Sequence, residues 1–117
     1  MFERLADADV CYLTTTGRRT GRPHEIEIWF AIRGRTLYLL SGGGHGADWV
    51  KNITRDPRVR LRINSQRASL RARIVRPGTA EDRAARELLD QKYLGWRPGR
   101  TLSRWARNAL PVAIDLG

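Results

Sequence analysis

The residues best suited to chemistry lie in one turn, Gly17-Arg18-Arg19-Thr20-Gly21-Arg22-Pro23. Its two glycines permit backbone dihedrals that other residues avoid, and its three arginines and successive N–H groups converge within one short loop. Such a loop can hold phosphate or carboxylate groups, whereas a solvated hairpin turn is the plainer alternative. We predict that this segment, the arginine turn, binds the anionic part of a ligand. The residues expected to do so are Arg18, Arg19, Thr20, Arg22 and Pro23.

A second candidate is the glycine-rich loop Ser41-Gly42-Gly43-Gly44. Its backbone amides can approach a planar ring or a phosphate, and the helix expected to begin near Asp48 adds a favourable dipole. Taken alone, a run of glycines is equally consistent with a loose connection. We expect this loop and the arginine turn to open on the same rim of a barrel, because their flanking strands are expected to be neighbours.

Aromatic side chains supply surface on which a flavin-like tricycle would stack, although ordinary core packing is the alternative for each of them. They are Tyr38, Trp49, Tyr93, Trp96 and Trp105.

Neither of the two histidines has a partner at metal-ligand spacing, so the sequence predicts no metal site. His45 lies in the glycine-rich loop, where it can hydrogen-bond a cofactor, whereas His24 at a strand start is interpreted as a surface residue. No G-x-S-x-G motif and no P-loop is present, so hydrolase chemistry is not supported.

The charge balance points to an anionic partner. The chain has 22 Lys and Arg residues against 12 Asp and Glu, a net charge of +10, and most of the cations are arginine. A phosphorylated cofactor, a dinucleotide, a nucleic acid or an acidic membrane surface would each satisfy this excess. Nucleic acid is not expected, although Arg58, Arg60 and Arg62 share one strand face, because no helix combines cations with base-reading groups.

Length and composition favour one compact domain spanning residues 1–117, since 41% of the residues are hydrophobic and no linker is evident. The first residues lack the apolar stretch of a signal peptide and no run approaches a membrane span, so a cytoplasmic location is expected. The lone Cys11 excludes an intramolecular disulfide framework.

The pattern of residues is mainly that of strands. Segments 10–16, 25–33 and 36–41 alternate or are β-branched and are separated by short glycine turns, which predicts an antiparallel meander. A short helix over 47–53 follows the third strand, and 58–63 with 70–74 predicts a second hairpin.

The main helix is expected to begin at the N-cap Thr79 and to end at Gly95. A short helix near Trp105 and a last strand over 111–116 complete the chain. Because closure removes exposed sheet edges, these elements predict a mainly β fold, an antiparallel barrel with one main helix before the last strand.

Several segments resemble the F420 (deazaflavin)-dependent nitroreductase family, within the split β-barrel flavin-binding superfamily related to pyridoxamine phosphate oxidases. The resemblance covers nearly the whole chain. The matching segments are Leu13 to Pro23 with the strand through Phe30, Ser41 to Gly44, Trp49 to Ile53, Asp56 to Val59 and Leu110 to Ile114.

The resemblance implies a split β-barrel in which Arg18, Arg19 and Arg22 grip the phosphate and glutamyl tail of F420. The loop from Ser41 to Gly44 and the helix with Trp49 and Asn52 would then border the deazaflavin. The acidic residues of His24-Glu25-Ile26-Glu27 depart from the family pattern and leave the substrate open. The substrate residues expected near the ring are Glu25, Glu27, Trp29, Trp96 and Trp105.

The implied reaction is hydride transfer from reduced F420 to an electron-poor acceptor such as a nitro compound, a quinone or an activated alkene. Ser41, Tyr93 and solvent are the candidate proton donors. Two alternatives keep the barrel: an FMN- or haem-binding protein, and a non-catalytic carrier of F420 or lipid. Peripheral contact with a membrane and a homodimer are left open as further partners.

Overall fold

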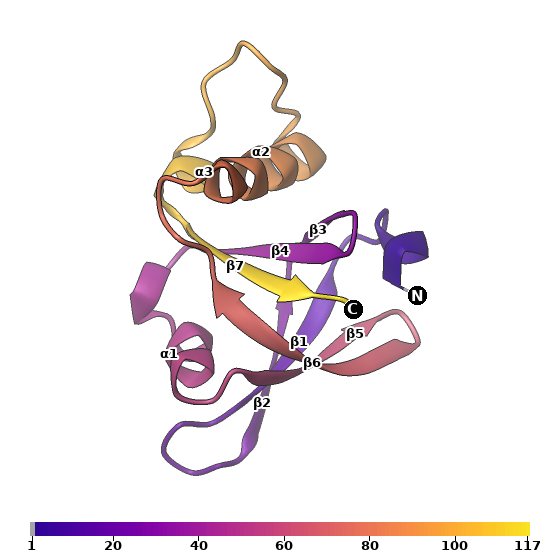
Figure 1. Ribbon diagram of the computed structural model, residues 1–117, viewed down its shortest axis with the longest axis vertical. Helices are drawn as coiled ribbons and strands as arrows, with labels where there is room; N and C mark the ends of the chain where they lie inside the picture. Colours follow the sequence, from indigo (N-terminus) through magenta and orange to yellow (C-terminus); the bar gives the residue numbers. More distant parts are fainter. Residues whose placement is uncertain (1) are drawn as a thin grey trace.

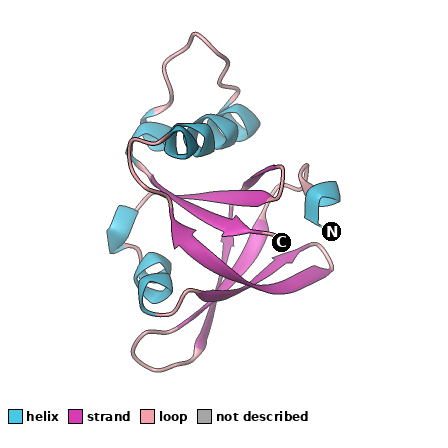
Figure 2. Cartoon of the chain, in the orientation of Figure 1, coloured by secondary structure: helices cyan, strands magenta, loops and turns pink. Residues whose placement is uncertain are grey.

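The computed structural model describes residues 2–117 and is dominated by one antiparallel sheet with helices at its margins (Figures 1 and 2). The strand order is β2-β1-β5-β6-β7-β4-β3. The strands are β1 (Cys11–Thr16), β2 (Pro23–Ile28), β3 (Ala31–Arg33), β4 (Thr36–Ser41), β5 (Arg58–Ile63), β6 (Gln66–Ile74) and β7 (Leu110–Asp115). The helices are η1 (Phe2–Leu5), η2 (Gly44–Gly46), α1 (Asp48–Arg55), α2 (Ala80–Leu94) and α3 (Arg104–Asn108).

The sheet curls into a half-barrel whose concave side holds the main core. Alternation along β1 sends Leu13 and Thr15 inward, where both are buried, and its register places Tyr12 and Thr14 on the outer face. The inward residues of the other strands complete this core, including Leu37, Leu61, Ile63 and Ile114. The predicted split-barrel fold, with a short helix after β4 and a main helix before the last strand, is confirmed.

The predicted strand over 25–33 is wrong in its middle. It is interrupted at Trp29 and Phe30, so its two parts, β2 and β3, lie at opposite edges of the sheet, where β2 pairs with β1 and β3 pairs with β4. The predicted three-stranded meander is therefore split into two hairpins. The main chain of Phe30 is bonded to α2: its N–H donates to the Tyr93 hydroxyl (3.0 Å) and its carbonyl accepts from Lys92 Nζ (2.9 Å). These contacts replace the sheet hydrogen bonds that a continuous strand would make.

Helix α2 packs on the outside of the sheet, where a second apolar cluster includes Tyr38, Leu40, Val75 and Leu89. The predicted boundaries of α2 are confirmed by its caps. The Thr79 hydroxyl accepts from the Asp82 N–H (3.1 Å), and Gly95 ends the helix in the left-handed conformation with a φ of 73°.

Helix α3 is fixed to α2 by the hydrogen bonds of two α2 side chains. Arg86 donates to the carbonyls of Ala106 and Arg107 at the end of α3, and the buried Asp90 carboxylate accepts from the N–H and hydroxyl of Ser103. The two helices therefore lie together at one end of the molecule (Figure 1). No helix within residues 2–117 has the length and apolar character needed to cross a bilayer.

An ion network between β6, α2 and β7 makes the free energy of unfolding depend on pH in the acid range. Arg73 bonds Glu81 (2.8 Å) and Asp115 (2.9 Å), and these hydrogen bonds hold the pKa of both carboxyls below their usual range. Such carboxylates confer stability above their ordinary pKa of about 4, and that stability is lost as the pH falls through the lowered folded values. We expect the free energy of unfolding to fall between about pH 4.5 and 3 in wild type, and to fall less over the same range in Arg73→Gln.

Urea titrations at a series of pH values measure this effect. Arg67→Gln on the same strand is the matched control, because Arg67 has no ion pair with another residue of the described range 2–117. Identical pH profiles for the two variants would contradict the prediction.

Candidate cofactor site

A groove of about 600 Å³ lies between the arginine turn, the inner side of β2 and α1. Its volume is within the range of small-molecule pockets, roughly 300–1,000 Å³. A larger depression of about 900 Å³ lies on the outer face of the sheet, but its lining contains no aromatic side chain on which a ring could stack. The residues lining the groove are Thr15, Gly17, Arg18, Arg19, Thr20, Pro23, His24, Glu25, Ile26, Asp48, Trp49 and Asn52.

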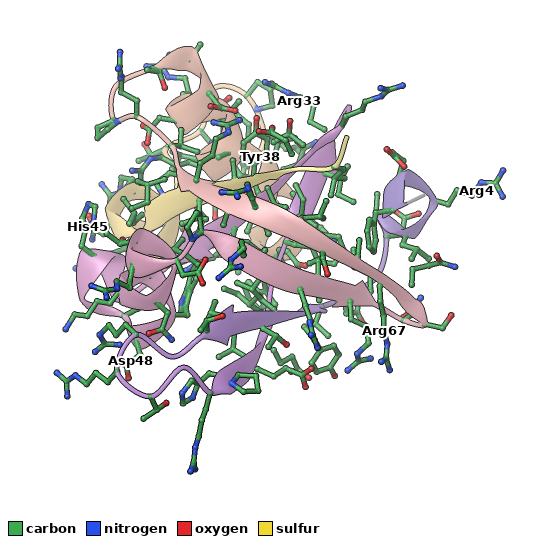
Figure 3. All side chains as sticks on the ribbon, turned by 60° about the horizontal axis from the view of Figure 1, so that its bottom comes forward. Arg4, Arg33, Tyr38, His45, Asp48 and Arg67 are labelled. Carbon is green, nitrogen blue, oxygen red and sulfur yellow. The ribbon has the colours of Figure 1, made fainter. Side chains whose placement is uncertain are left out.

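Asn52 connects the arginine turn to α1 from a buried position. Its Oδ1 accepts from the backbone N–H of Arg18 (3.2 Å) and from Arg18 Nη1 (3.0 Å), and its Nδ2 donates to Thr15 Oγ1 (3.0 Å). Arg18 Nη2 also contacts Asp48 Oδ1 (3.2 Å), and Figure 3 shows Asp48 beside the turn. Arg18 is thus held in one orientation, and three of its five side-chain N–H groups have no hydrogen-bond partner within residues 2–117.

The rest of the turn is shaped by its own backbone. The N–H of Gly17 donates to the Arg22 carbonyl (2.7 Å), and the N–H of Arg22 donates to Thr20 Oγ1 (3.2 Å). Arg19 and Arg22 are exposed, but only Arg19 lines the groove. The structure therefore brings four of the five predicted turn residues to the groove wall and places the Arg22 side chain outside it.

His24 is a groove residue that sequence analysis missed. It pairs with Thr15 on the inner face of the sheet, and its imidazole lies directly over Gly17. A methyl group added to Gly17 would lie 2.7 Å from His24 Nε2 and 3.0 Å from the Arg22 carbonyl, so a side chain here would require the imidazole to shift. The alternation that points Ile26 into the groove also places His24 there, and this was the signal available in the sequence.

The glycine-rich loop lies between β4 and α1 and does not line the groove. Ser41 is buried, and its hydroxyl donates to the Gly44 carbonyl (2.9 Å). Gly42 and Gly43 are exposed, and a methyl group on Gly42 would contact the Trp105 ring at 3.9 Å. The loop therefore faces α3, whereas Trp49 of α1 lines the groove.

Three aromatic side chains form a cluster beside this loop. Trp29 stacks on Tyr93 with ring centroids 4.3 Å apart and planes within 2°, and it meets Trp105 edge-on at 5.4 Å. Trp29 remains 40% exposed. Trp96 instead donates its indole N–H to the Arg100 carbonyl (2.8 Å) within the loop that follows α2.

The Tyr93 hydroxyl is surrounded by main-chain groups. It lies 2.8 Å from the carbonyl of Asp9 and 3.0 Å from both the N–H and the carbonyl of Phe30, and burial raises its pKa. These contacts fix the aromatic cluster to the bend between β2 and β3. The Tyr93 hydroxyl does not line the groove, so the predicted role of Tyr93 as proton donor has no contact there to support it.

The two acidic residues of β2 lie differently from each other. Glu25 is on the rim, where it lines the groove, whereas Glu27 accepts from the Tyr12 hydroxyl (2.8 Å) on the outer face. Arg62 stacks over the same Tyr12 ring at 4.1 Å. Of the predicted acidic pair, only Glu25 is therefore close to the groove.

The fold is shared with several solved structures. The chain is similar to a conserved hypothetical protein from Mycobacterium tuberculosis (TM-score 0.78, 20% identity, 99% of this chain and 80% of that one). It is similar to an F420H2-dependent reductase (TM-score 0.70, 14% identity, 92% and 94%) and to HutZ, the heme storage protein from Vibrio cholerae (TM-score 0.74, 12% identity, 98% and 86%). At these identities the likeness establishes the fold alone.

The family is established by a different comparison. The model of a family described as F420H2-dependent quinone reductase matches residues 1–116. The predicted resemblance to F420-dependent enzymes is thereby confirmed, and the alternative of a non-catalytic carrier is not supported. Because the match spans almost the entire sequence, the chain belongs to the F420H2-dependent quinone reductase family and is an F420-dependent oxidoreductase.

Proposed function

We propose that this protein binds F420 in the groove beside the arginine turn and reduces a quinone. The observation that carries the proposal is the chemistry of the groove wall. Its lining residues include two arginines, Arg18 and Arg19, together with the aromatic Trp49 and the apolar Ile26. An anionic tail and a planar ring in one molecule match such a wall.

Within the groove, Arg18 and Arg19 would bind the phosphate or carboxylates of the tail, with Thr20 and the turn backbone nearby. Arg22, outside the groove wall, would meet carboxylates that extend past the turn. Asn52 would act through Arg18, because it holds that side chain in place before the ligand arrives. Bound F420 in its reduced form supplies the hydride.

The acceptor is proposed to bind beside the aromatic cluster of Trp29, Tyr93 and Trp105, next to Gly42 and Gly43. The exposed part of Trp29 offers a surface on which a quinone ring can stack. Reduction of a quinone takes one hydride and one proton. Solvent is the proposed source of that proton, because the hydroxyls of Ser41 and Tyr93 are engaged with main-chain groups.

The proposal is tested by titrating the purified protein separately with F420, FMN and haemin. We expect saturable quenching of F420 fluorescence, and oxidation of reduced F420 by a benzoquinone in a single turnover. Tight binding of FMN or haemin without binding of F420 would overturn the cofactor assignment. If the protein reduces a nitroaromatic or an activated alkene but reduces no quinone, the proposed acceptor is wrong.

Arg19→Gln is expected to weaken F420 binding about tenfold, since one hydrogen-bonded charge pair contributes roughly 1.5 kcal/mol. The substitution removes the charge and keeps a polar side chain, although glutamine is two bonds shorter than arginine. Fluorescence titration at constant ionic strength gives the Kd, and Arg67→Gln on β6 controls for the change in net charge. Equal affinities for wild type and Arg19→Gln would contradict this contact.

Trp29→Ala is expected to lower kcat/KM for an aromatic quinone about tenfold, because a stacked pair contributes roughly 0.5–1.5 kcal/mol beyond its buried area. The Kd for F420 should stay unchanged, since Trp29 does not line the groove. Trp29→Phe keeps an aromatic face and should recover most of the rate. Loss of F420 affinity in Trp29→Ala would show that the acceptor position has been misplaced.

A further inference from the structure

A cationic surface with apolar side chains lies at the end of the molecule opposite the arginine turn. It comprises the end of α2, the loop 95–103 and the exposed side of α3. In Figure 1 this loop projects beyond α2 and α3 at the top, whereas the turn between β1 and β2 lies at the bottom. We call it the loop-end surface and define it by Leu94, Arg97, Arg100, Arg104 and Arg107.

The positive charge of the loop-end surface is not compensated by the protein. Residues 91–114 contain five cations and no Asp or Glu, and Lys92 alone among those cations is directed into the protein. The four arginines are exposed, and none of their guanidinium groups has a hydrogen bond or ion pair with another residue in the described part of the chain, 2–117. Arg73 and Arg86 on neighbouring elements are both paired. This concentration of charge is suited to an anionic partner.

Apolar side chains are also exposed at this end of the molecule, which favours an anionic partner that has an apolar layer. The large hydrophobic side chains exposed in residues 2–117 are Leu94, at 52%, and Trp29, at 40%. Trp29 stacks on the Tyr93 ring, and Leu94 follows Tyr93 as the last residue of α2. A phospholipid surface offers anionic head groups above an apolar layer, and aromatic and aliphatic side chains flanked by arginine are typical of proteins that bind there.

We propose that the loop-end surface docks on an anionic phospholipid membrane. The arginines contact the head groups, while Leu94 and part of Trp29 enter the interface between head groups and acyl chains. Docking in this way turns the aromatic cluster toward the bilayer, where a quinone with an apolar tail is dissolved. That last step rests on the proposed function, whereas the docking itself needs neither cofactor nor acceptor.

The test is co-sedimentation of the full chain, without F420, with large vesicles of phosphatidylglycerol and phosphatidylcholine at physiological salt. Pure phosphatidylcholine vesicles and duplex DNA are the comparison ligands. The variants are Arg97→Glu/Arg100→Glu and Leu94→Gln. The matched control is Arg67→Glu/Arg71→Glu, which makes the same change in charge on β6, and Figure 3 shows Arg67 at the tip of the β5–β6 hairpin.

We expect binding to the anionic vesicles that falls at least about 25-fold in the loop variant, since each cation near such a surface contributes about 1 kcal/mol, or fivefold. The control should lose less than about threefold, and Leu94→Gln should lose affinity with no change in charge. Equal losses in the two double variants, unchanged binding of Leu94→Gln, no binding to anionic vesicles, or equally tight binding to DNA would each overturn the proposal. If the protein binds F420 but not anionic vesicles, the docking alone is refuted. If it binds anionic vesicles but not F420, the proposed function alone is refuted.

Discussion

Replacing Asn52 by alanine is expected to weaken F420 binding about 100-fold, the loss of roughly 2.7 kcal/mol. The substitution removes three hydrogen bonds at once, two from Arg18 and one to Thr15. Arg18 would then lose its fixed orientation, and the arginine turn its attachment to α1. Because Asn52 is 4% exposed, the buried Thr15 hydroxyl would also be left without a partner. Fluorescence titration with F420 measures the change in Kd.

Two variants separate this effect from loss of folding. Asn52→Asp keeps an oxygen that accepts from both Arg18 groups, and the Thr15 hydroxyl can donate to its other oxygen, so most of the affinity should return. Thr54→Ala, elsewhere on α1, removes one local hydrogen bond to the Val50 carbonyl and should leave the Kd unchanged. If Asn52→Ala folds and binds F420 as tightly as wild type, the turn does not depend on this connection.

Replacing Lys92 by methionine is expected to lower the free energy of unfolding by about 3 kcal/mol. Its ammonium donates to the carbonyls of Ala6 (2.9 Å), Ala8 (2.8 Å) and Phe30 (2.9 Å) and lies 3.8 Å from the Phe30 ring centroid. Partial burial lowers the pKa of Lys92, so the loss of these bonds is offset in part by relief of desolvation. Methionine fills a similar volume but leaves the three carbonyls unsatisfied.

Urea unfolding at pH 7 measures this change. Lys51→Met on α1, an exposed position, is the matched control and should change stability by less than about 0.5 kcal/mol. Limited proteolysis should also cut Lys92→Met faster within residues 2–9, because Lys92 attaches that segment to α2. A stability within 1 kcal/mol of wild type would mean that water satisfies the carbonyls.

The elements that sequence analysis placed well carry their own local signals. Thr79 and Gly95 mark the ends of α2, because a hydroxyl cap and a left-handed glycine act within a few residues. The break at Trp29 and Phe30 has no such signal, since both are aromatic residues that favour strands. Its cause lies more than 60 residues away, in Lys92 and Tyr93, which bond the backbone of Phe30.

The candidate site divides in the same way. The turn between β1 and β2 could be located from the sequence, because its glycines and arginines lie within seven residues; that its arginines bind an anion stays a prediction. The contact of Arg18 with Asn52 depends on a helix 34 residues later, and sequence analysis assigned Asn52 to the ring rather than to the turn. A role as proton donor for Ser41 or Tyr93 assumes a free hydroxyl. Both hydroxyls are instead hydrogen-bonded to main-chain groups, which no sequence pattern predicts.

A half-barrel that stays open along β2 also leaves a row of unpaired main-chain groups there, since β2 pairs only with β1. Rows of this kind recruit strands from other molecules and lead to aggregation. β2 begins with Pro23, which has no N–H to offer, and it carries Glu25 and Glu27, whose like charges would repel a second copy. The like charges of Glu25 and Glu27 therefore work against edge-to-edge pairing of β2 with the same strand of a second copy.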